Sequence, residues 1–275
     1  MTRVALFQST TGIDPDANAR ALEDAIAQAA AGGAEILFTP EMSGLLDRDS
    51  ARAASKLRTE EEDPLLARCL EAARRHRIWL HLGSIAVLSG SGKVANRAFV
   101  IDREGEIRAR YDKLHLFDVD LPTGESWRES NLYSAGEGVV LLNGTPVGKL
   151  GLTICYDLRF PGLFARLAEA DADVIAVPAA FTVPTGKAHW HILLRARAIE
   201  AGLFVIAAAQ VGHHEDGRQT FGHSLVVDPW GEVLLDMGEK PGVGFADIDL
   251  KRISDVRSRI PALNHRRPIP DAVTL

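Results

Sequence analysis

Short apolar segments alternate with amphipathic ones along the chain, and glycine, proline or polar residues separate them. The apolar segments have the length of strands, whereas the amphipathic ones repeat apolar residues at helical spacing. Helices alternating with apolar strands indicate an α/β layered architecture. Strands are predicted over residues 4–7, 35–39, 79–85, 94–101, 147–154, 173–177, 203–209, 222–227 and 243–249, with a hairpin turn over 89–92. Helices are predicted from Pro15 up to the glycines at 32 and 33, and over residues 64–76, 161–170 and 189–201.

Candidate functional residues follow the ends of three predicted strands. Residues 33–40 resemble residues 172–178, and in both segments an apolar strand ends at a proline. Glu41, Cys155 and Ala179 each follow such a strand end, which is where sites form in open α/β sheets. The stretch over residues 114–138 shows no clear periodicity and is too long for an idle connection, so we expect it to border the site.

Composition and charge narrow the class of protein. A chain of 275 residues with 46% hydrophobic and 25% charged residues is ordinary for a globular protein, and we predict one domain over 1–275. The formal net charge is -6 and the basic residues are scattered among acids, so the sequence shows no basic patch of the kind that binds nucleic acid. No signal peptide is visible, and the most apolar stretch, 203–209, is far shorter than the ~20 residues that span a bilayer. These features predict no nucleic-acid partner and no membrane partner.

The two cysteines have different surroundings. They form no disulfide framework and no zinc-ligand pattern, so a reducing, cytoplasmic location fits best. Cys69 lies on the apolar face of the predicted helix 64–76 and is expected to be a small core residue. Cys155 lies where a strand turns toward a helix, which would expose the sulfur, point backbone N–H groups at its target and lower the thiol pKa. The alternative is a cysteine that only packs a strand end.

Two further residues are ambiguous when taken singly. Glu41 follows a buried strand in a stretch otherwise poor in charge, yet a solvated loop glutamate is equally ordinary. Lys113 lies beside apolar residues just past a strand-like segment, where a surface lysine is also common. Neither decides a function alone.

Together these residues resemble the nitrilase superfamily of carbon–nitrogen hydrolases. The motifs follow in the family's order: Pro40-Glu41, Lys-Leu-His-Leu-Phe over 113–117, and Cys-Tyr-Asp-Leu-Arg-Phe over 155–160. The resemblance implies that Cys155 is the nucleophile, Glu41 the general base and Lys113 the cation that stabilises the oxyanion. Glu129 corresponds to the family's second glutamate, which would orient Lys113 and Glu41, and the backbone N–H of Tyr156 would be a second oxyanion donor.

The resemblance also implies a fold, an assembly and a reaction. The fold is expected to be a four-layer α-β-β-α sandwich that forms a homodimer or a higher homo-oligomer, with residues 157–170 and 251–275 as candidate contacts. The reaction is amide hydrolysis through a thioester on Cys155, without metal or organic cofactor.

The resemblance implies that the substrate is a small-molecule amide. The C-terminal third is most similar to the deaminated glutathione amidases, with Lys187 and His191 as departures, and the omega-amidases acting on 2-oxoglutaramate are the alternative. Arg159 is expected either to bind a substrate carboxylate or to pair with an acid such as Asp157 or Glu129. Phe181 and Thr185, expected on a loop after the strand 173–177, would form the opposite wall, although Phe181 also suits the core.

Three competing interpretations remain. A papain-like Cys–His hydrolase lacks its cysteine motif here. A metal site on the histidines is disfavoured, because His189 and His191 are two positions apart in a predicted helix and point to different sides. A nitrilase-like scaffold without catalysis, acting as a binding or interaction module, is disfavoured by the complete set of four motif residues.

Overall fold

Two β-sheets pack face to face in the computed structural model, which describes residues 1–89, 92–120, 124 and 126–274. The first sheet has the order β17 (Gly242–Ile248), β1 (Thr2–Gln8), β2 (Ile36–Phe38), β3 (Trp79–Leu88), β4 (Val94–Ile101) and β5 (Ile107–Asp112), with β8 (Tyr133–Ser134) beside β4. The second has the order β16 (Val233–Asp236), β15 (Leu225–Val227), β12 (Phe204–Ala207), β11 (Val174–Ala176), β10 (Gly148–Leu152) and β9 (Leu141–Thr145).

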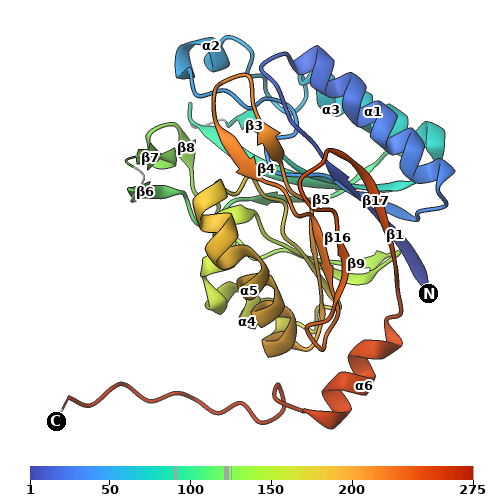
Figure 1. Cartoon of the computed structure of the whole chain (residues 1–275), viewed down its shortest axis with the longest axis vertical. Helices are drawn as coiled ribbons and strands as arrows, with labels where there is room; N and C mark the ends of the chain where they lie inside the picture. Colours follow the sequence, from blue (N-terminus) through green and yellow to red (C-terminus); the bar gives the residue numbers. More distant parts are fainter. Residues whose placement is uncertain (90–91, 121–123, 125, 275) are drawn as a thin grey trace.

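The remaining elements are helices and short ribbons. The helices are α1 (Pro15–Ala31), α2 (Ser50–Ala54), α3 (Pro64–His76), α4 (Pro161–Glu169), α5 (Val183–Ala201) and α6 (Lys251–Arg259), with 3₁₀ turns η1 (Glu129–Asn131) and η2 (Cys155–Arg159). Two antiparallel pairs, β6 (Asp118–Asp120) with β7 (Ser126–Arg128) and β13 (Val211–His213) with β14 (Gln219–Phe221), lie outside the sheets. Beyond α6 the chain is irregular: Leu263 packs against the core and Arg266 pairs with Glu169 of α4 before the end of the chain extends from the body (Figure 1).

Alternating side chains build the four layers. In β4, Ala98 and Val100 belong to the core between the sheets, whereas Phe99 and Ile101 belong to the core under α1 and α3. Helices α4 and α5 cover the outer face of the second sheet, so each sheet lies between its partner sheet and a helical layer (Figure 1). The period-two alternation of a strand makes this double burial possible. The expected α-β-β-α sandwich is confirmed.

Parallel pairing brings the ends of the central strands together. In the first sheet β2 runs parallel to β1 and β3, and in the second β11 runs parallel to β10 and β12. The carboxyl ends of β2, β10 and β11 therefore carry Glu41, Cys155 and Ala179, as the sequence predicts, and an amide from the third segment, Ala180, donates to Glu41 over 2.9 Å.

The structure corrects several predicted boundaries. Helix α5 begins at Val183 instead of at 189, because Pro184 occupies the first turn, where its missing N–H costs nothing. Thr185 therefore lies in a helix and not on a loop. Strand β5 is the strand-like segment expected just before Lys113. Strands β9 and β16 and helix α2 were not predicted, because they are exposed or short and show little apolar period. Of the predicted hairpin turn at 89–92, residues 90 and 91 lie outside the described residues.

No helix in the described part of the chain combines the length and apolar character that crossing a membrane requires.

Candidate active site

Cys155 occupies a strained turn between β10 and α4. Its φ of 48° lies in the left-handed region, which residues other than glycine adopt at a cost and mostly at functional sites. The backbone N–H of Cys155 donates to the carbonyl of Pro178 over 2.9 Å, which anchors the turn to the end of the neighbouring strand β11. The cysteine is 92% buried, but it lines the main cavity.

A buried carboxylate holds this turn in place. Asp157 accepts hydrogen bonds from the backbone N–H of Ile154 (2.8 Å), the hydroxyl of Tyr111 (2.7 Å) and the backbone N–H of His115 (3.0 Å). Nδ1 of His115 lies 2.6 Å from the same carboxylate, and its ring stacks on Phe160 at 3.6 Å. Asp157, His115 and Phe160 all belong to the motifs that carry the resemblance, so the motifs encode the shape of the turn as well as its chemistry.

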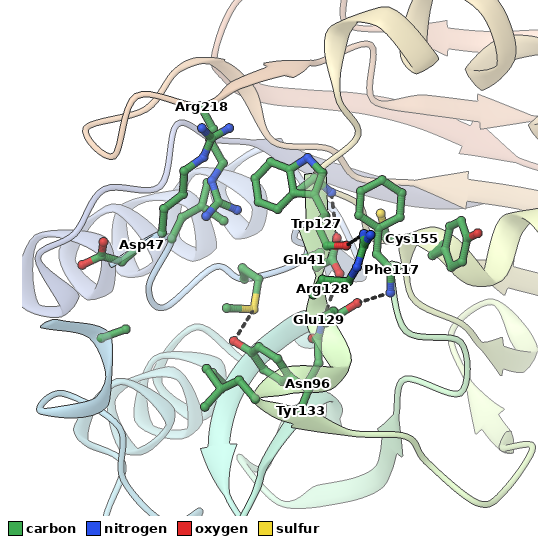
Figure 2. A pocket seen from close by; sticks show the side chains of 18 of the residues that line it. Glu41, Asp47, Asn96, Phe117, Trp127, Arg128, Glu129, Tyr133, Cys155 and Arg218 are labelled. Carbon is green, nitrogen blue, oxygen red and sulfur yellow. Dashed lines mark hydrogen bonds between the residues drawn. The ribbon is translucent and has the colours of Figure 1, made fainter. Parts of the chain in front are cut away.

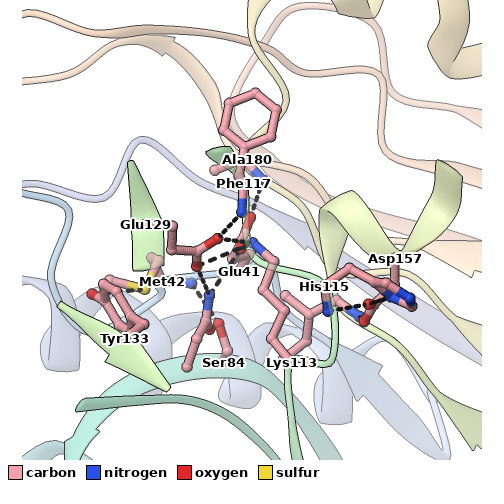
Figure 3. Close-up of polar contacts among 12 residues, drawn as sticks. Glu41, Met42, Ser84, Lys113, His115, Phe117, Glu129, Tyr133, Asp157 and Ala180 are labelled. Carbon is pink, nitrogen blue, oxygen red and sulfur yellow. Dashed lines mark hydrogen bonds and ion pairs between the residues drawn. The ribbon is translucent and has the colours of Figure 1, made fainter. Parts of the chain in front are cut away.

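Lys113 lies buried between two glutamates (Figure 3). Its Nζ is 2.8 Å from Oε1 of Glu41, and 2.9 Å and 3.2 Å from the two oxygens of Glu129. Asn96, on β4, donates through Nδ2 to both glutamates, over 3.0 Å to Glu41 and 3.1 Å to Glu129. Lys113, Glu41 and Glu129 are thus brought together as the sequence predicts, and Asn96 is a member that sequence reasoning missed.

Backbone groups complete the partners of the two carboxylates. The N–H of Phe117 donates to Oε2 of Glu129 over 2.7 Å, and the N–H of Ala180 donates to Oε2 of Glu41. Gln210 donates to the carbonyl of Glu41 over 2.9 Å. Because buried charges are stable only when paired and hydrogen-bonded, these donors fix both carboxylates in one arrangement.

The cluster favours a charged Glu41–Lys113 pair beside a neutral thiol. Burial opposes the charge of Glu41, but Lys113 outweighs it and the pKa of Glu41 is lowered. Burial likewise opposes the charge of Lys113, but Glu129 and Glu41 raise the pKa of the ammonium well above its ordinary value. For Cys155, burial and the neighbouring Glu41 raise the thiol pKa well above 9.0, although Lys113 opposes them. The expectation of a lowered thiol pKa was therefore wrong, since it considered the turn and not the adjacent carboxylate.

A cavity of about 520 Å³ opens above this cluster (Figure 2). Glu41, Lys113, Glu129 and Cys155 lie at its wall, together with Tyr156. Its size is that of a site for a small organic molecule. The stretch over 114–138 borders it, as expected, through residues that include Phe117, Trp127, Arg128 and Leu132.

The predicted substrate-binding residues divide into two groups. Phe181 and Thr185 line the cavity, and Phe181 also packs on Trp190 with ring centroids 4.8 Å apart, so it serves wall and core at once. Arg159 is not among the residues that line this cavity. Its guanidinium lies 5.6 Å from the centre of the Phe181 ring, and Nη2 is 3.3 Å from Nδ1 of His189. Asp157 and Glu129 bind other donors, so the ion pairs considered for Arg159 are not formed.

One group of side chains in the described part of the chain has metal-binding geometry. Ligand atoms of His191, His223 and Asp236 lie within 4.8 Å of one another, away from the cavity. Oxygen atoms of Asp236 lie 3.0 Å from Nε2 of His191 and 2.9 Å from Nδ1 of His223. In the sequence, only the spacing of His189 and His191 was considered. This group was missed because its members come from a helix and two distant segments.

Known proteins are similar to this chain in sequence and in fold. A family model described as carbon-nitrogen hydrolase matches residues 3–258. A deaminated glutathione amidase from Yersinia enterocolitica is 40% identical over 276 residues, covering 98% of this chain and 94% of that protein. The crystal structure of the C. elegans NitFhit protein has a TM-score of 0.89 at 38% identity and covers 97% of this chain, which spans only 65% of that protein.

A third relative carries a modified cysteine. It is a Glu-to-Gln mutant of the amidase from Nesterenkonia sp. AN1, whose structure shows covalent addition of the acetamide moiety of fluoroacetamide at the active site cysteine. Its TM-score is 0.82 at 28% identity, with 97% of this chain and 94% of that chain covered. The chain thus belongs to the carbon–nitrogen hydrolase family within the nitrilase superfamily, and it is a hydrolase of carbon–nitrogen bonds other than peptide bonds.

Proposed function

We propose that this hydrolase cleaves the amide of deaminated glutathione through a thioester on Cys155. The observation that carries the chemistry is the buried Glu41–Lys113–Glu129 cluster beside a cysteine at the wall of a cavity. Each charged group in that cluster has an oppositely charged or hydrogen-bonded partner, as buried polar groups require. Such an arrangement supplies a base, an acid and a cation around one nucleophile.

In the first half-reaction the sulfur of Cys155 attacks the amide carbon while the thiol proton moves to Glu41. Because the resting thiol is neutral, attack and proton transfer are coupled, and no free thiolate accumulates. Lys113 and the backbone N–H of Tyr156 stabilise the negative charge that develops on the carbonyl oxygen. Glu41 returns the proton to the nitrogen, the C–N bond breaks, and the acyl group remains on sulfur.

In the second half-reaction water attacks the thioester. Glu41 takes a proton from that water, the C–S bond breaks, and the sulfur regains the proton as the acid departs. Glu129 acts through Lys113: its two oxygens hold the ammonium on one side while Glu41 holds it on the other. No step of this scheme uses a cofactor.

The choice of deaminated glutathione rests on the relatives and on the cavity. Several relatives at about 40% identity bear that name. In this substrate a ketone replaces the α-amine of glutathione, so the amide joins 2-oxoglutarate to cysteinylglycine. A cavity of about 520 Å³ accommodates a ligand of that length, whereas 2-oxoglutaramate, which ends at the amide nitrogen, would fill only part of it.

The test is a comparison of amides by release of the acid product, which is 2-oxoglutarate for the two keto-acid amides and glutamate for intact glutathione. Wild-type protein should hydrolyse deaminated glutathione with a higher kcat/KM than 2-oxoglutaramate, and intact glutathione should be a poor substrate. Cys155→Ala should abolish turnover and leave thermal unfolding nearly unchanged. Equal activity of Cys155→Ala would remove the nucleophile assignment, and no turnover of any keto-acid amide would remove the substrate class.

Assembly and location complete the proposal. The segment 157–170, which contains α4, and the C-terminal residues 251–275 are the candidate contacts of a homodimer. Both cysteines are free, which suits a reducing, cytoplasmic compartment. Light scattering of the full chain would test the dimer, and a monomer at micromolar concentration would contradict it.

A further inference from the structure

Three side chains of the types that bind metals come together outside the cavity. His191 belongs to α5, His223 lies just after β14, and Asp236 is the last residue of β16. Their ligand atoms lie within 4.8 Å of one another, and none of the three residues lines the cavity that contains Cys155. His191 is also one of the two departures from the deaminated glutathione amidases, so the resemblance does not account for this group.

The two imidazole rings converge on one carboxylate. Nε2 of His191 lies 3.0 Å from Oδ2 of Asp236, and Nδ1 of His223 lies 2.9 Å from Oδ1 and 3.1 Å from Oδ2. Zinc bonds to imidazole nitrogen and carboxylate oxygen are about 2.0–2.2 Å long, so two ligand atoms of a tetrahedral ion are roughly 3.3 Å apart. The observed N–O separations are slightly shorter. A small outward movement of the side chains would therefore admit an ion between them.

Neighbouring groups that are not ligands hold these side chains in place. The ring of Phe221 stacks on His223 with centroids 4.5 Å apart and meets the ring of His191 edge-on at 6.1 Å. The backbone N–H of Gly238 donates to Oδ1 of Asp236 over 2.9 Å. His223 has a left-handed φ of 54°, a conformation that residues other than glycine adopt at a cost. Contacts of this kind orient metal ligands before an ion arrives.

The donor set selects the class of ion. At neutral pH an aspartate is charged and an imidazole is mostly neutral, and these are the forms that bind metals. A neutral imidazole carries its proton on either nitrogen, so each ring can present a lone pair to an ion by holding the proton on the nitrogen that faces away. Two imidazoles and one carboxylate suit Zn²⁺ and similar transition metals, whereas Mg²⁺ and Ca²⁺ prefer oxygen ligands alone.

We propose that His191, His223 and Asp236 bind one zinc ion or a chemically similar transition-metal ion. The side chains are 36%, 21% and 34% exposed, so an ion has an entry path, and three protein ligands leave a fourth position for water. The role of the ion is structural. It joins His191 to Asp236, 45 positions further along the chain, and so fixes α5 against β16 at the edge of the second sheet.

Metal binding is measured on untagged protein by titration with Zn²⁺, and with Co²⁺, whose absorption reports tetrahedral geometry. Cys155→Ala is the background for these titrations, because the thiolate of Cys155 is a competing zinc ligand. One ion should bind per chain, and zinc at about 100 times its Kd should raise Tm by about 5 °C or more. Mg²⁺ should leave Tm unchanged. Failure of both Zn²⁺ and Co²⁺ to bind, or an equal effect of Mg²⁺, would overturn the proposal.

The variants are His191→Gln, His223→Asn and Asp236→Asn, with His213→Gln as the matched control. Asparagine suits position 223 because it tolerates a left-handed φ. His213 is an exposed histidine of β13 outside the group, so its variant removes one imidazole and keeps the three ligands. Each ligand variant should weaken zinc binding at least about 10-fold, since even the outer contacts of metal ligands are worth that much. His213→Gln should bind zinc as tightly as its parent.

Thermal unfolding with a chelator present checks the folding of each variant without metal, and if one variant does not fold the other two carry the test. Unchanged zinc affinity in a folded ligand variant would overturn the proposed site. An equal loss in His213→Gln would place the ion elsewhere and would also overturn it. Hydrolysis by wild-type protein should be nearly unchanged by the chelator, because the group lies outside the cavity. Loss of hydrolysis with the chelator would overturn the structural role.

Discussion

Replacing Glu41 with glutamine should separate two roles of that carboxylate. The substitution keeps the size of the side chain and removes the base, so hydrolysis should fall by about 10²- to 10⁴-fold, as is typical for loss of a general base. At the same time Cys155 should become more reactive toward alkylating agents at neutral pH. Removing the catalytic base should thus activate the nucleophile.

The reason lies in the charges around the sulfur. Apart from burial, the carboxylate of Glu41 is the main factor that raises the thiol pKa, both through its charge and through its hydrogen bond with the thiol. Lys113 opposes it, and Glu41→Gln leaves this cation with Glu129 as its one carboxylate partner in the cluster. Two unit charges about 4 Å apart interact by about 4 kcal/mol at an effective dielectric constant of 20. Even a third of this, about 1.4 kcal/mol, makes the thiolate about tenfold more populated.

Iodoacetamide labelling followed by intact mass gives the measurement. At pH 7, Glu41→Gln should label at least about tenfold faster than wild type, and its rate should level off at a lower pH. Asn96→Ala is the matched control, because it removes a hydrogen bond to Glu41 and keeps the carboxylate. Slower labelling of Glu41→Gln than of wild type would show that Glu41 generates the thiolate at rest, and the coupled mechanism would be wrong.

Three further outcomes test the site. Iodoacetamide should modify Cys155 well before Cys69, whose thiol pKa burial raises to about 12 within the core; preferential labelling of Cys69 would contradict the site. The pKa of Glu41 is lowered below 4.5, and the pKa values of Lys113 and the Cys155 thiol are raised, so kcat/KM should stay flat from about pH 5 to 9. The ion pair should lose its stabilising effect only in more acidic solution, where Glu41 becomes protonated. A rise of kcat/KM with a midpoint near pH 8.5 would refute this. Asp157→Asn should lower Tm by about 5–10 °C, since an amide cannot accept all four bonds; an unchanged Tm in calorimetry would contradict that role.

The layered fold was predictable because its central strands are apolar on both faces. Strand β2 and strand β11 are buried throughout, so each gives a continuous apolar run ending at a proline. Edge elements carry a weaker signal. Most side chains of β16 and some of those of β9 are exposed, so neither strand shows an alternation of apolar and polar residues in the sequence. A single domain over 1–275 and the dimer contacts stay predictions.

The chemistry at the site was predictable to the extent that it lies in contiguous motifs. Glu41, Lys113 and Cys155 each belong to a short run with neighbours that repeat in the family, and Glu129 was assigned because it corresponds to the family's second glutamate. Asn96 belongs to no such motif, and an asparagine inside a β-strand does not by itself indicate a site. Its contact with both glutamates arises only when β3 pairs with β2 on one side and with β4 on the other.

The direction of the thiol pKa shift shows why motifs alone mislead about mechanism. A cysteine at the start of a helical turn is ordinarily made more acidic by the N–H groups it faces. Here the turn is a single 3₁₀ segment before α4, and a full negative charge on Glu41 lies beside the sulfur. A full charge at short range outweighs partial charges, so the neutral thiol is favoured. In the mechanism proposed above, the reactive form is then created only when a carbonyl oxygen reaches Lys113, which ties the reactivity of the sulfur to the presence of an amide.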